Sequence, residues 1–417
     1  MIALYDQYHD SSNIKIRVLL IEREAKDIYT DDWGDKLHES VCNIGSTTNF
    51  SNIEDNFMKL KALKDEALSQ LINDFAKNRY VNPVDTKLII KTLKKIDSNL
   101  CRPLYALFLT DAQIHGDNLL NWDRSHALKY VCEREQKRIE EYIQKGLERG
   151  SVVPAVHKKI FDACERFIVT ATLSGGLDCK RAEEIASEDW KYLDNVIANM
   201  YGKNDTLSLL SAVGIIPTEV DCASERIPPL EPDLIGEYYC ILWVKNMLKN
   251  ELETKNRELL ENVLDRALKN DLRAAAIVRD RIMRDFPDEL QNNGDKIFGT
   301  IKIPNGVTTI EEKTFHVCSH LIEIHIPSGV DTIKRHAFFG CTNLTEIHIP
   351  DSVTTIKERS FYWCRSLTEI HIPNNITTIE NEAFGECEQL AIVHLPNKNI
   401  NIAKNAFPKH TKICIIP

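Results

Sequence analysis

Residues 344–364 read LTEIHIPDSVTTIKERSFYWC, and closely similar segments stand at 321–341 and 367–387. Several residue types in this part of the chain recur with one constant step, the step from Pro327 to Pro350. A fixed period of this size, shared by several residue types, is typical of a solenoid in which each repeat forms one turn. The recurring prolines and phenylalanines are Pro304, Pro327, Pro350, Pro373 and Pro396, and Phe315, Phe338, Phe361, Phe384 and Phe407.

The segment LTEIHIP predicts a short strand with one buried face, because its apolar and polar residues alternate. We expect Ile347 and Ile349 to point into a core, and Glu346 and His348 to point into solvent. Pro350 has no backbone N–H to donate to a neighbouring strand, so it should end this one.

The rest of the unit supplies the other sides of the core. Val353 and Ile356 are predicted to return to it after a turn, and Phe361 and Cys364 to enter from the far side. No unit can bury its apolar face alone, so stacking of successive units must create the core. A thiol in every unit is typical of a small buried hydrophobic residue. These thiols belong to Cys318, Cys341, Cys364 and Cys387.

The outward-facing polar residues should form columns, because successive strands lie about 4.8 Å apart and equivalent residues stack. One column of histidines and one of glutamates are predicted to face solvent on a concave sheet, where solenoids usually bind partners. We therefore take both columns as the candidate partner-binding surface. Its residues are Glu323, His325, Glu346, His348, Glu369, His371 and His394.

Three interpretations of this surface stay open. It could be a solvated face copied by duplication, which is the simplest account of a repeated charge pattern. It could bind a protein, which is compatible with the first interpretation. It could also be a metal ladder or a pH sensor, since histidine titrates close to neutral pH. We predict no metal, because metal sites need convergent ligands and these histidines form a straight row.

The unit L-x-x-I-x-I-P, V-x-x-I, A-F-x-x-C resembles the leucine-rich repeats of the bacterial surface-antigen (BspA-like) class, over residues 298–417. The resemblance implies a short curved solenoid, an α/β leucine-rich-repeat fold, with a parallel sheet on its concave side. The last unit departs from the pattern, since the step from Pro396 to Pro417 is shorter than the others and His410 replaces the cysteine. Terminal repeats are commonly irregular because they cap the stack.

The first 297 residues show no such period, and the spacing of their apolar residues predicts a mainly helical region. The exception is IKIRVLLIERE at 14–24, a short apolar run that predicts a buried parallel strand. The highly charged segment 256–286 predicts a helical connector with solvated faces, and QNNGD at 291–295 predicts the boundary before the repeats. Further helices are predicted at 57–80, 83–96 and 126–150.

Four sequence blocks stand in this region: RVLLIERE…W (17–33), RPLYALFLTDAQIHG (102–116), W…LKYVCEREQKRI (122–139) and PPLEPDLIGEYYCILWV (228–244). In their order they resemble segments of bacterial STAND signalling NTPases, the relatives of Nod-like sensors. The first block would end a strand of the P-loop core with a sensor arginine, which makes Arg17 and Arg23 candidates for nucleotide contact. The second resembles a lid motif whose proline packs on the base, which implies Pro103 with Arg102 beside it. The later blocks resemble a helical or winged-helix module that carries a closed-to-open switch.

The phosphate-binding loop of such NTPases, G-x-x-x-x-G-K-[ST], does not occur in the sequence. That loop cradles the phosphates and supplies the lysine that neutralises them, so we predict no catalytic activity and no cofactor for this chain. ATP and Mg²⁺ would bind only if a longer gene or a partner chain supplied the loop. The expected organisation is a remnant of the P-loop core at 1–45, a helical lid-like domain at 46–125, a helical or winged-helix-like domain at 126–235, a helical connector at 236–297 and the solenoid at 298–417.

Composition narrows the expected partners. The net charge of −10 argues against a nucleic acid, because binding a phosphate backbone needs a surplus of lysine and arginine. No apolar run approaches the ~20 residues of a membrane helix, and the first residues lack the pattern of a signal peptide. We therefore predict a cytoplasmic sensor that binds a protein partner through its repeats, with no membrane association and with self-association through the N-terminal region as an option. The alternatives are a nucleotide-dependent switch ATPase and a BspA-like surface adhesin.

Overall fold

A computed structural model describes most of the chain. The described residues are 64–77, 84–97, 103–148, 154–190, 226–227, 230, 233–248, 254–290, 294–396 and 399–416. The strand predicted at 14–24 lies outside them. The chain divides into two compact units, Met1–Tyr130 and Val131–Pro417. In the described part of the chain, no helix combines the length and the apolar character needed to span a bilayer.

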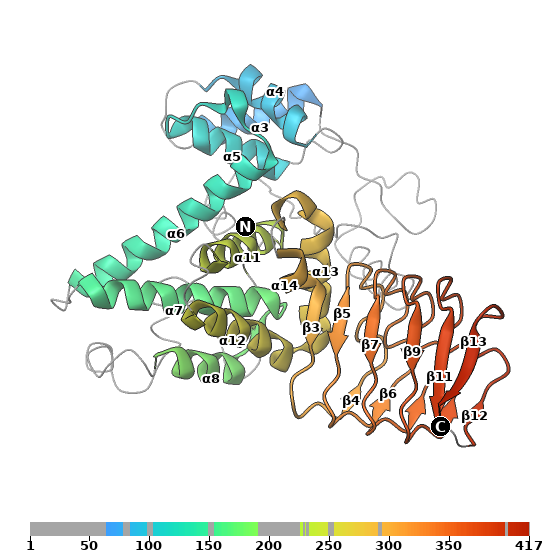
Figure 1. Ribbon diagram of the computed structural model, residues 1–417. Helices are drawn as coiled ribbons and strands as arrows, with labels where there is room; N and C mark the ends of the chain where they lie inside the picture. Colours follow the sequence, from blue (N-terminus) through green and yellow to red (C-terminus); the bar gives the residue numbers. More distant parts are fainter. Residues whose placement is uncertain are drawn as a thin grey trace, which may run out of the picture. The chain divides into compact units, whose positions relative to one another are not determined.

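The first unit is a small group of helices with a shared apolar core (Figure 1). Its buried side chains recur at helical spacing, as Leu68 and Ile72 do on the first of them. Asp85 caps the second helix, because its carboxylate accepts a hydrogen bond from the backbone N–H of Leu88 at 3.0 Å. The helices are α3 (Asp65–Lys77), α4 (Thr86–Ile96), α5 (Pro103–Ile114), the 3₁₀ turn η2 (Leu119–Asn121) and the first part of α6 (Arg124–Glu148).

Helices also open the second unit, and a buried polar network joins three of them. Glu165 of α7 accepts hydrogen bonds from Gln136 of α6 at 2.7 Å and from Tyr239 of α11 at 3.0 Å. Burial raises the pKa of the Glu165 carboxyl, and these two donors oppose that shift. The elements here are α7 (Pro154–Leu173), α8 (Cys179–Trp190), α11 (Asp233–Leu248), α12 (Thr254–Asn270), α13 (Leu272–Asp285), η3 (Pro287–Leu290), α14 (Gly294–Gly299), and the antiparallel pair β1 (Leu177–Asp178) and β2 (Arg226–Ile227).

The segment 256–286 is not a solvated connector, and that prediction was wrong. The segment forms two helices that meet at Asp271. The side chain of this residue accepts a hydrogen bond from the backbone N–H of Ala274 and caps the start of α13. Both halves bury one face, including Val263 of α12 and Ile282 of α13. The many charged residues of this segment made its apolar stripe hard to recognise in the sequence, and this stripe packs against the rest of the unit.

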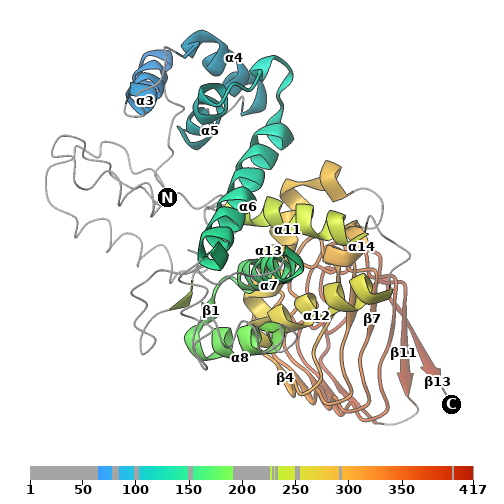
Figure 2. The same cartoon turned by 90° about the vertical axis from the view of Figure 1, so that its left-hand side faces the viewer.

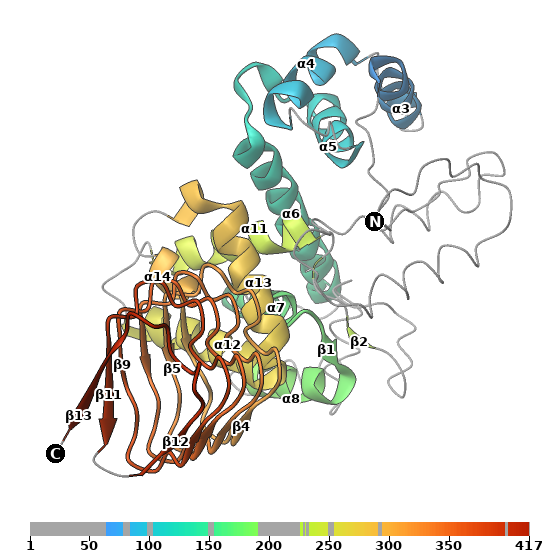
Figure 3. The same ribbon diagram turned by 90° about the vertical axis from the view of Figure 1, so that its right-hand side faces the viewer.

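The solenoid follows, and its backbone winds between two rows of parallel strands. The longer strands are β3 (Thr300–Lys302), β5 (Glu323–His325), β7 (Glu346–His348), β9 (Glu369–His371), β11 (Ile392–Pro396) and β13 (Lys412–Ile416). The shorter strands are β4 (Thr309–Ile310), β6 (Thr332–Ile333), β8 (Thr355–Ile356), β10 (Thr378–Ile379) and β12 (Asn401–Ile402). Figure 3 shows the two rows on different sides of the stack. We call one turn of the solenoid a rung.

The rows differ in continuity. The short strands form one five-stranded sheet, whereas the long strands form two ladders, β3-β5-β7 and β9-β11-β13. In both rows the pairing keeps equivalent residues of successive units in register, as with Ile347 opposite Ile324. The repeat period therefore sets the register, because a shift of one residue would turn the buried isoleucines into solvent.

The core of the solenoid confirms the predicted inward positions. Phe338, Phe361 and Phe384 are fully buried. Their rings lie parallel, with centroids 5.0 Å apart from one rung to the next. Each phenylalanine therefore packs between its two equivalents, and no single unit could bury it alone.

The recurring thiols are buried, as predicted, and those of Cys341, Cys364 and Cys387 also donate hydrogen bonds. Sγ of Cys364 lies 3.3 Å from the carbonyl oxygen of Phe338, in the rung before it. Burial raises the pKa of each thiol, to about 12 for Cys387, so the S–H proton is retained for this bond. The same carbonyl oxygen accepts from the backbone N–H of Cys341, so each of these three thiols uses the second lone pair of a carbonyl group that is already bonded.

Helices α13 and α14 cover the end of the stack that begins with β3 (Figures 1 and 2). Oδ1 of Asp280 accepts a hydrogen bond from the backbone N–H of His320 at 2.7 Å. Gly299 lies so close to the first rung that an added Cβ would stand 2.9 Å from Ile322 and 3.0 Å from Met283. The helical part of the unit thus closes the exposed end of the solenoid core.

Candidate functional site

The two predicted polar columns stand on the long strands, and we call them the Glu–His face. Their residues are Glu323, His325, Glu346, His348, Glu369, His371 and His394. The ladders place Glu323 opposite Glu346, and His325 opposite His348. A break separates β7 from β9, so the face consists of two ladders and not of the single sheet that the repeat suggested. In the histidine column, Lys302 precedes the first histidine and Cys414 follows the last.

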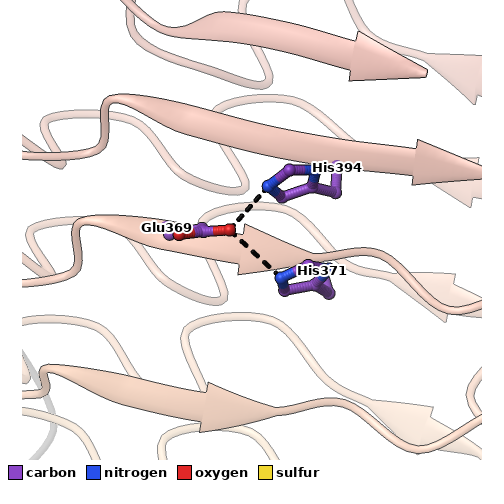
Figure 4. A group of neighbouring side chains, drawn as sticks. All are labelled: Glu369, His371 and His394. Atoms are coloured by element: carbon purple, nitrogen blue, oxygen red, sulfur yellow. Dashed lines mark hydrogen bonds and ion pairs between the residues drawn. The ribbon is translucent and has the colours of Figure 1, made fainter. Parts of the chain in front are cut away.

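Charge pairing on the Glu–His face differs from rung to rung. Nε2 of His371 lies 3.1 Å from Oε1 of Glu369, the residue two positions earlier in the same strand. The same oxygen lies 2.6 Å from Nε2 of His394 in the next rung. Figure 4 shows one carboxylate oxygen facing the Nε2 edges of both imidazole rings, which stack on each other with centroids 4.2 Å apart. A single carboxylate oxygen therefore serves two histidines.

A second surface carries stacked aromatic rings, which we call the aromatic ridge: His316, Phe339, Tyr362 and Trp363. The first three rings lie nearly parallel at successive centroid distances of 5.0 and 5.3 Å. Trp363 is 41% exposed. The guanidinium carbon of Arg359 lies 5.6 Å from the centroid of Tyr362, and that of Arg365 lies 5.6 Å from the centroid of Trp363. At these distances each guanidinium can interact with the ring face.

Sequence reasoning missed the aromatic ridge, although a signal for it exists. Each of its first three rings follows directly after a buried phenylalanine, so they share the period of the repeat. The residue type changes from His316 to Phe339 to Tyr362 and then to Gly385, which concealed the column. A Cβ at Gly385 would lie 2.7 Å from Cδ2 of Tyr362, so the missing side chain leaves the space that the tyrosine ring occupies.

Comparison with known proteins agrees with the repeat geometry. Residues 293–414 match the family described as "BspA type Leucine rich repeat region", in 6 copies. These residues are BspA-type leucine-rich repeats. No curated protein matches the chain.

Three solved structures are similar to the BspA-type repeats. A leucine rich cell surface protein from Faecalibacterium prausnitzii is 36% identical, over 28% of this chain and 31% of that one, with a TM-score of 0.27. A leucine-rich repeat protein from Bacteroides ovatus is 33% identical, over 28% and 30%, with a TM-score of 0.26. The leucine-rich repeat protein of T. pallidum is 34% identical, over 23% and 45%, with a TM-score of 0.23. The chain spans less than half the length of each.

Ion pairs link the BspA-type repeats along their surface. Several of these pairs join equivalent or neighbouring columns of successive rungs, such as Lys357 with Glu380 at 2.8 Å and Arg359 with Glu382 at 2.5 Å. Exposed pairs of this kind contribute little stability individually. Here they fix the long side chains that border the aromatic ridge, and so they hold Arg359 over the tyrosine ring.

The nucleotide-contact candidates stand apart from the BspA-type repeats in sequence. Arg17, Arg23 and Arg102 lie outside the described residues. Pro103 is the first residue of α5, a position that suits proline because its backbone nitrogen needs no hydrogen bond there. Their role in nucleotide contact stays a prediction.

Proposed function

We propose that this chain is a cytoplasmic, non-catalytic interaction protein whose BspA-type repeats bind a protein partner. The observation that carries this proposal is the aromatic ridge with its two arginines. Tryptophan, tyrosine and arginine are the residue types that dominate the binding energy of protein interfaces. An exposed Trp363 beside Tyr362, Arg359 and Arg365 has this composition.

The rigidity of the ridge supports the same proposal. Tyr362 is packed against Phe339, and Trp363 contacts both of these rings, at centroid distances of 5.4 and 5.6 Å. A side chain that is already held in place loses little conformational entropy when a partner binds. The backbone of Trp363 has φ of 65°, a left-handed conformation that the repeated turn imposes on this position.

The Glu–His face is the second candidate surface. Glu346 and His348 are exposed, and neither takes part in a hydrogen bond or ion pair among the described residues. Their polar groups are free to meet a partner, which favours a polar or charged contact there. This face and the aromatic ridge can be tested separately, since they share no residue.

The experiment is a capture with the immobilised chain, identification of the bound protein, and measurement of its Kd for three purified variants. Trp363→Ala should raise the Kd by about 30-fold or more, as the loss of an interface centre does. Glu346→Ala combined with His348→Ala tests the Glu–His face. Asp331→Ala removes an exposed carboxylate that belongs to neither surface and serves as the matched control. A Kd unchanged in the first two variants would refute both surfaces.

The N-terminal helices are proposed to relay partner binding, as the STAND resemblance implies. Nucleotide is not needed for this role, so a calorimetric titration of the chain with ATP and Mg²⁺ should show no binding. Clear micromolar binding would overturn the non-catalytic assignment and favour the nucleotide-switch alternative.

Light scattering of the chain at several concentrations tests self-association, and antibody labelling of intact cells tests the surface-adhesin alternative.

A further inference from the structure

Glu369, His371 and His394 bring three potential metal ligands together (Figure 4). One ligand atom from each of them lies within 4.8 Å of the other two. Among the described residues, no other group of three or more His, Cys, Asp or Glu side chains meets this condition. The two histidine rings are parallel, with 5° between their planes, so both Nε2 atoms approach the carboxylate from the same side of the sheet.

The three ligands converge because one position of the repeated sequence changes in β11. In the rungs of β5 and β9, the histidine pairs with the glutamate two residues before it, at 3.0 and 3.1 Å. In β11 the equivalent position holds Ile392. His394 therefore has no carboxylate in its own strand at that position, and it reaches back to Glu369. The β9–β11 ladder places it directly opposite His371, so two imidazoles meet at one carboxylate.

We propose that Glu369, His371 and His394 form a binding site for a divalent transition-metal ion, with zinc as the preferred ion. Two imidazole nitrogens and one carboxylate oxygen are a common zinc ligand set. A tetrahedral ion with bonds of about 2.0–2.2 Å separates its ligand atoms by about 3.4 Å. The side chains need only small rotations to reach that spacing, because the Glu369 side chain is 47% exposed and the His371 side chain 64%.

The sequence prediction of no metal rested on the straight row of histidines, and it did not include a carboxylate from the neighbouring rung. The ion would lie between the two Nε2 atoms and the carboxylate oxygen of Glu369, which now contact one another directly. Its charge also suits this position, because the carboxylate is negative and the imidazoles bind metal in their neutral form.

Two consequences follow from the geometry. Three protein ligands leave one tetrahedral position open for water or for a side chain of another molecule. The ion would also join β9 to β11, and a ligand that binds only the folded state raises its stability. Zinc binding should therefore raise the melting temperature of the chain.

The test is a calorimetric titration of the full chain with ZnCl₂, with the thiols kept reduced. His394→Ala should weaken the affinity by at least about tenfold, as the loss of a ligand or its support does. His325→Ala is the matched control, because it removes an equivalent histidine outside the proposed site. His325 pairs with Glu323 of its own rung, and among the described residues no second imidazole contacts that glutamate. This variant should leave the affinity unchanged within about twofold. Equal affinities in the wild type and in His394→Ala would overturn the proposal.

Cysteines are the main competing metal ligands. The absorption spectrum of bound Co²⁺ distinguishes a cysteine site from the proposed site. A site of two histidines and a carboxylate gives the visible bands of tetrahedral cobalt without the charge-transfer absorption of a thiolate. A thiolate band on the first equivalent of Co²⁺ would also overturn the proposal. Melting curves of the metal-free variants should match the wild type, because neither histidine belongs to the core.

Discussion

The protonation of a single histidine in the aromatic ridge is set by its neighbours. His316 stacks on Phe339, with 9° between the ring planes. Burial lowers the pKa of His316 to about 4, and the nearby charge of Lys313 and the neighbouring His336 act in the same direction. At neutral pH this side chain is therefore uncharged, and it extends the stack as an aromatic ring would.

Acid should destabilise the repeats through His316. In the unfolded chain its pKa is about 6.5, so between about pH 6.5 and 4 the unfolded state binds a proton that the folded state does not. Stability must fall as the pH is lowered through this window. His316→Phe should reduce the loss, because it keeps the stack and removes the titration. The measurement is the urea midpoint at pH 7 and at pH 5 for each protein.

The comparison for His316→Phe is His348→Phe, an equivalent change at an exposed histidine outside the ridge. It should lose as much stability between the two pH values as the wild type does. If His316→Phe also shows the full wild-type loss, the acid sensitivity lies elsewhere in the chain.

At the scale of elements, the rung is the unit that the sequence specifies best. The constant period predicts the long strands, the inward isoleucines and the buried phenylalanines, because each follows from apolar residues at fixed positions. The backbone of the turns could not be predicted in this way. Each full unit repeats two left-handed positions, and of these only Gly340 is a glycine. The others are Lys313, Val317, His336, Arg359, Trp363, Glu382 and Glu386.

The candidate surfaces also divide into one that the repeat predicts and others that it does not. The Glu–His face could be predicted because its residues recur without change, whereas the aromatic ridge changes residue type in every rung. The metal ligands could not be foreseen, since the sequence alone does not show which side chain His394 contacts when Ile392 stands at the glutamate position of its strand. Only the reach of His394 back to Glu369 shows what that change of residue does.

Removing one phenylalanine should damage the whole stack of rungs. Phe361 lies between two equivalent rings and is fully buried, so Phe361→Ala should lower the free energy of unfolding by about 3–5 kcal/mol. Phe407→Ala is the control, because Phe407 is only partly buried and ends the stack. It should cost clearly less in the same urea titration. Equal losses in the two variants would mean that stacking between rungs does not set the cost.

At the scale of the second unit, stability depends on how the helices cover the first rung. Arg279 of α13 is almost fully buried, and its Nη2 donates a hydrogen bond to the carbonyl oxygen of Ile297 at 2.8 Å. Burial lowers the pKa of its guanidinium to about 10. Next to it, Asp280 accepts from the backbone of His320, within the first full rung. One turn of α13 thus contacts both α14 and the repeats, and the repeated sequence alone contains no sign of this contact.

The contact between Asp280 and His320 should control whether the first rungs stay closed. Asp280→Ala leaves the part-buried backbone N–H of His320 without its acceptor, which should cost about 1 kcal/mol. Asp280→Asn keeps an acceptor oxygen at the same place and should cost less. Hydrogen exchange locates the effect: in Asp280→Ala the amides of β3 and β5 should exchange faster, while those of β9 and β11 keep their wild-type rates. Uniform acceleration along all rungs would show that the solenoid unfolds as one body, so that its helical cover stabilises every repeat equally.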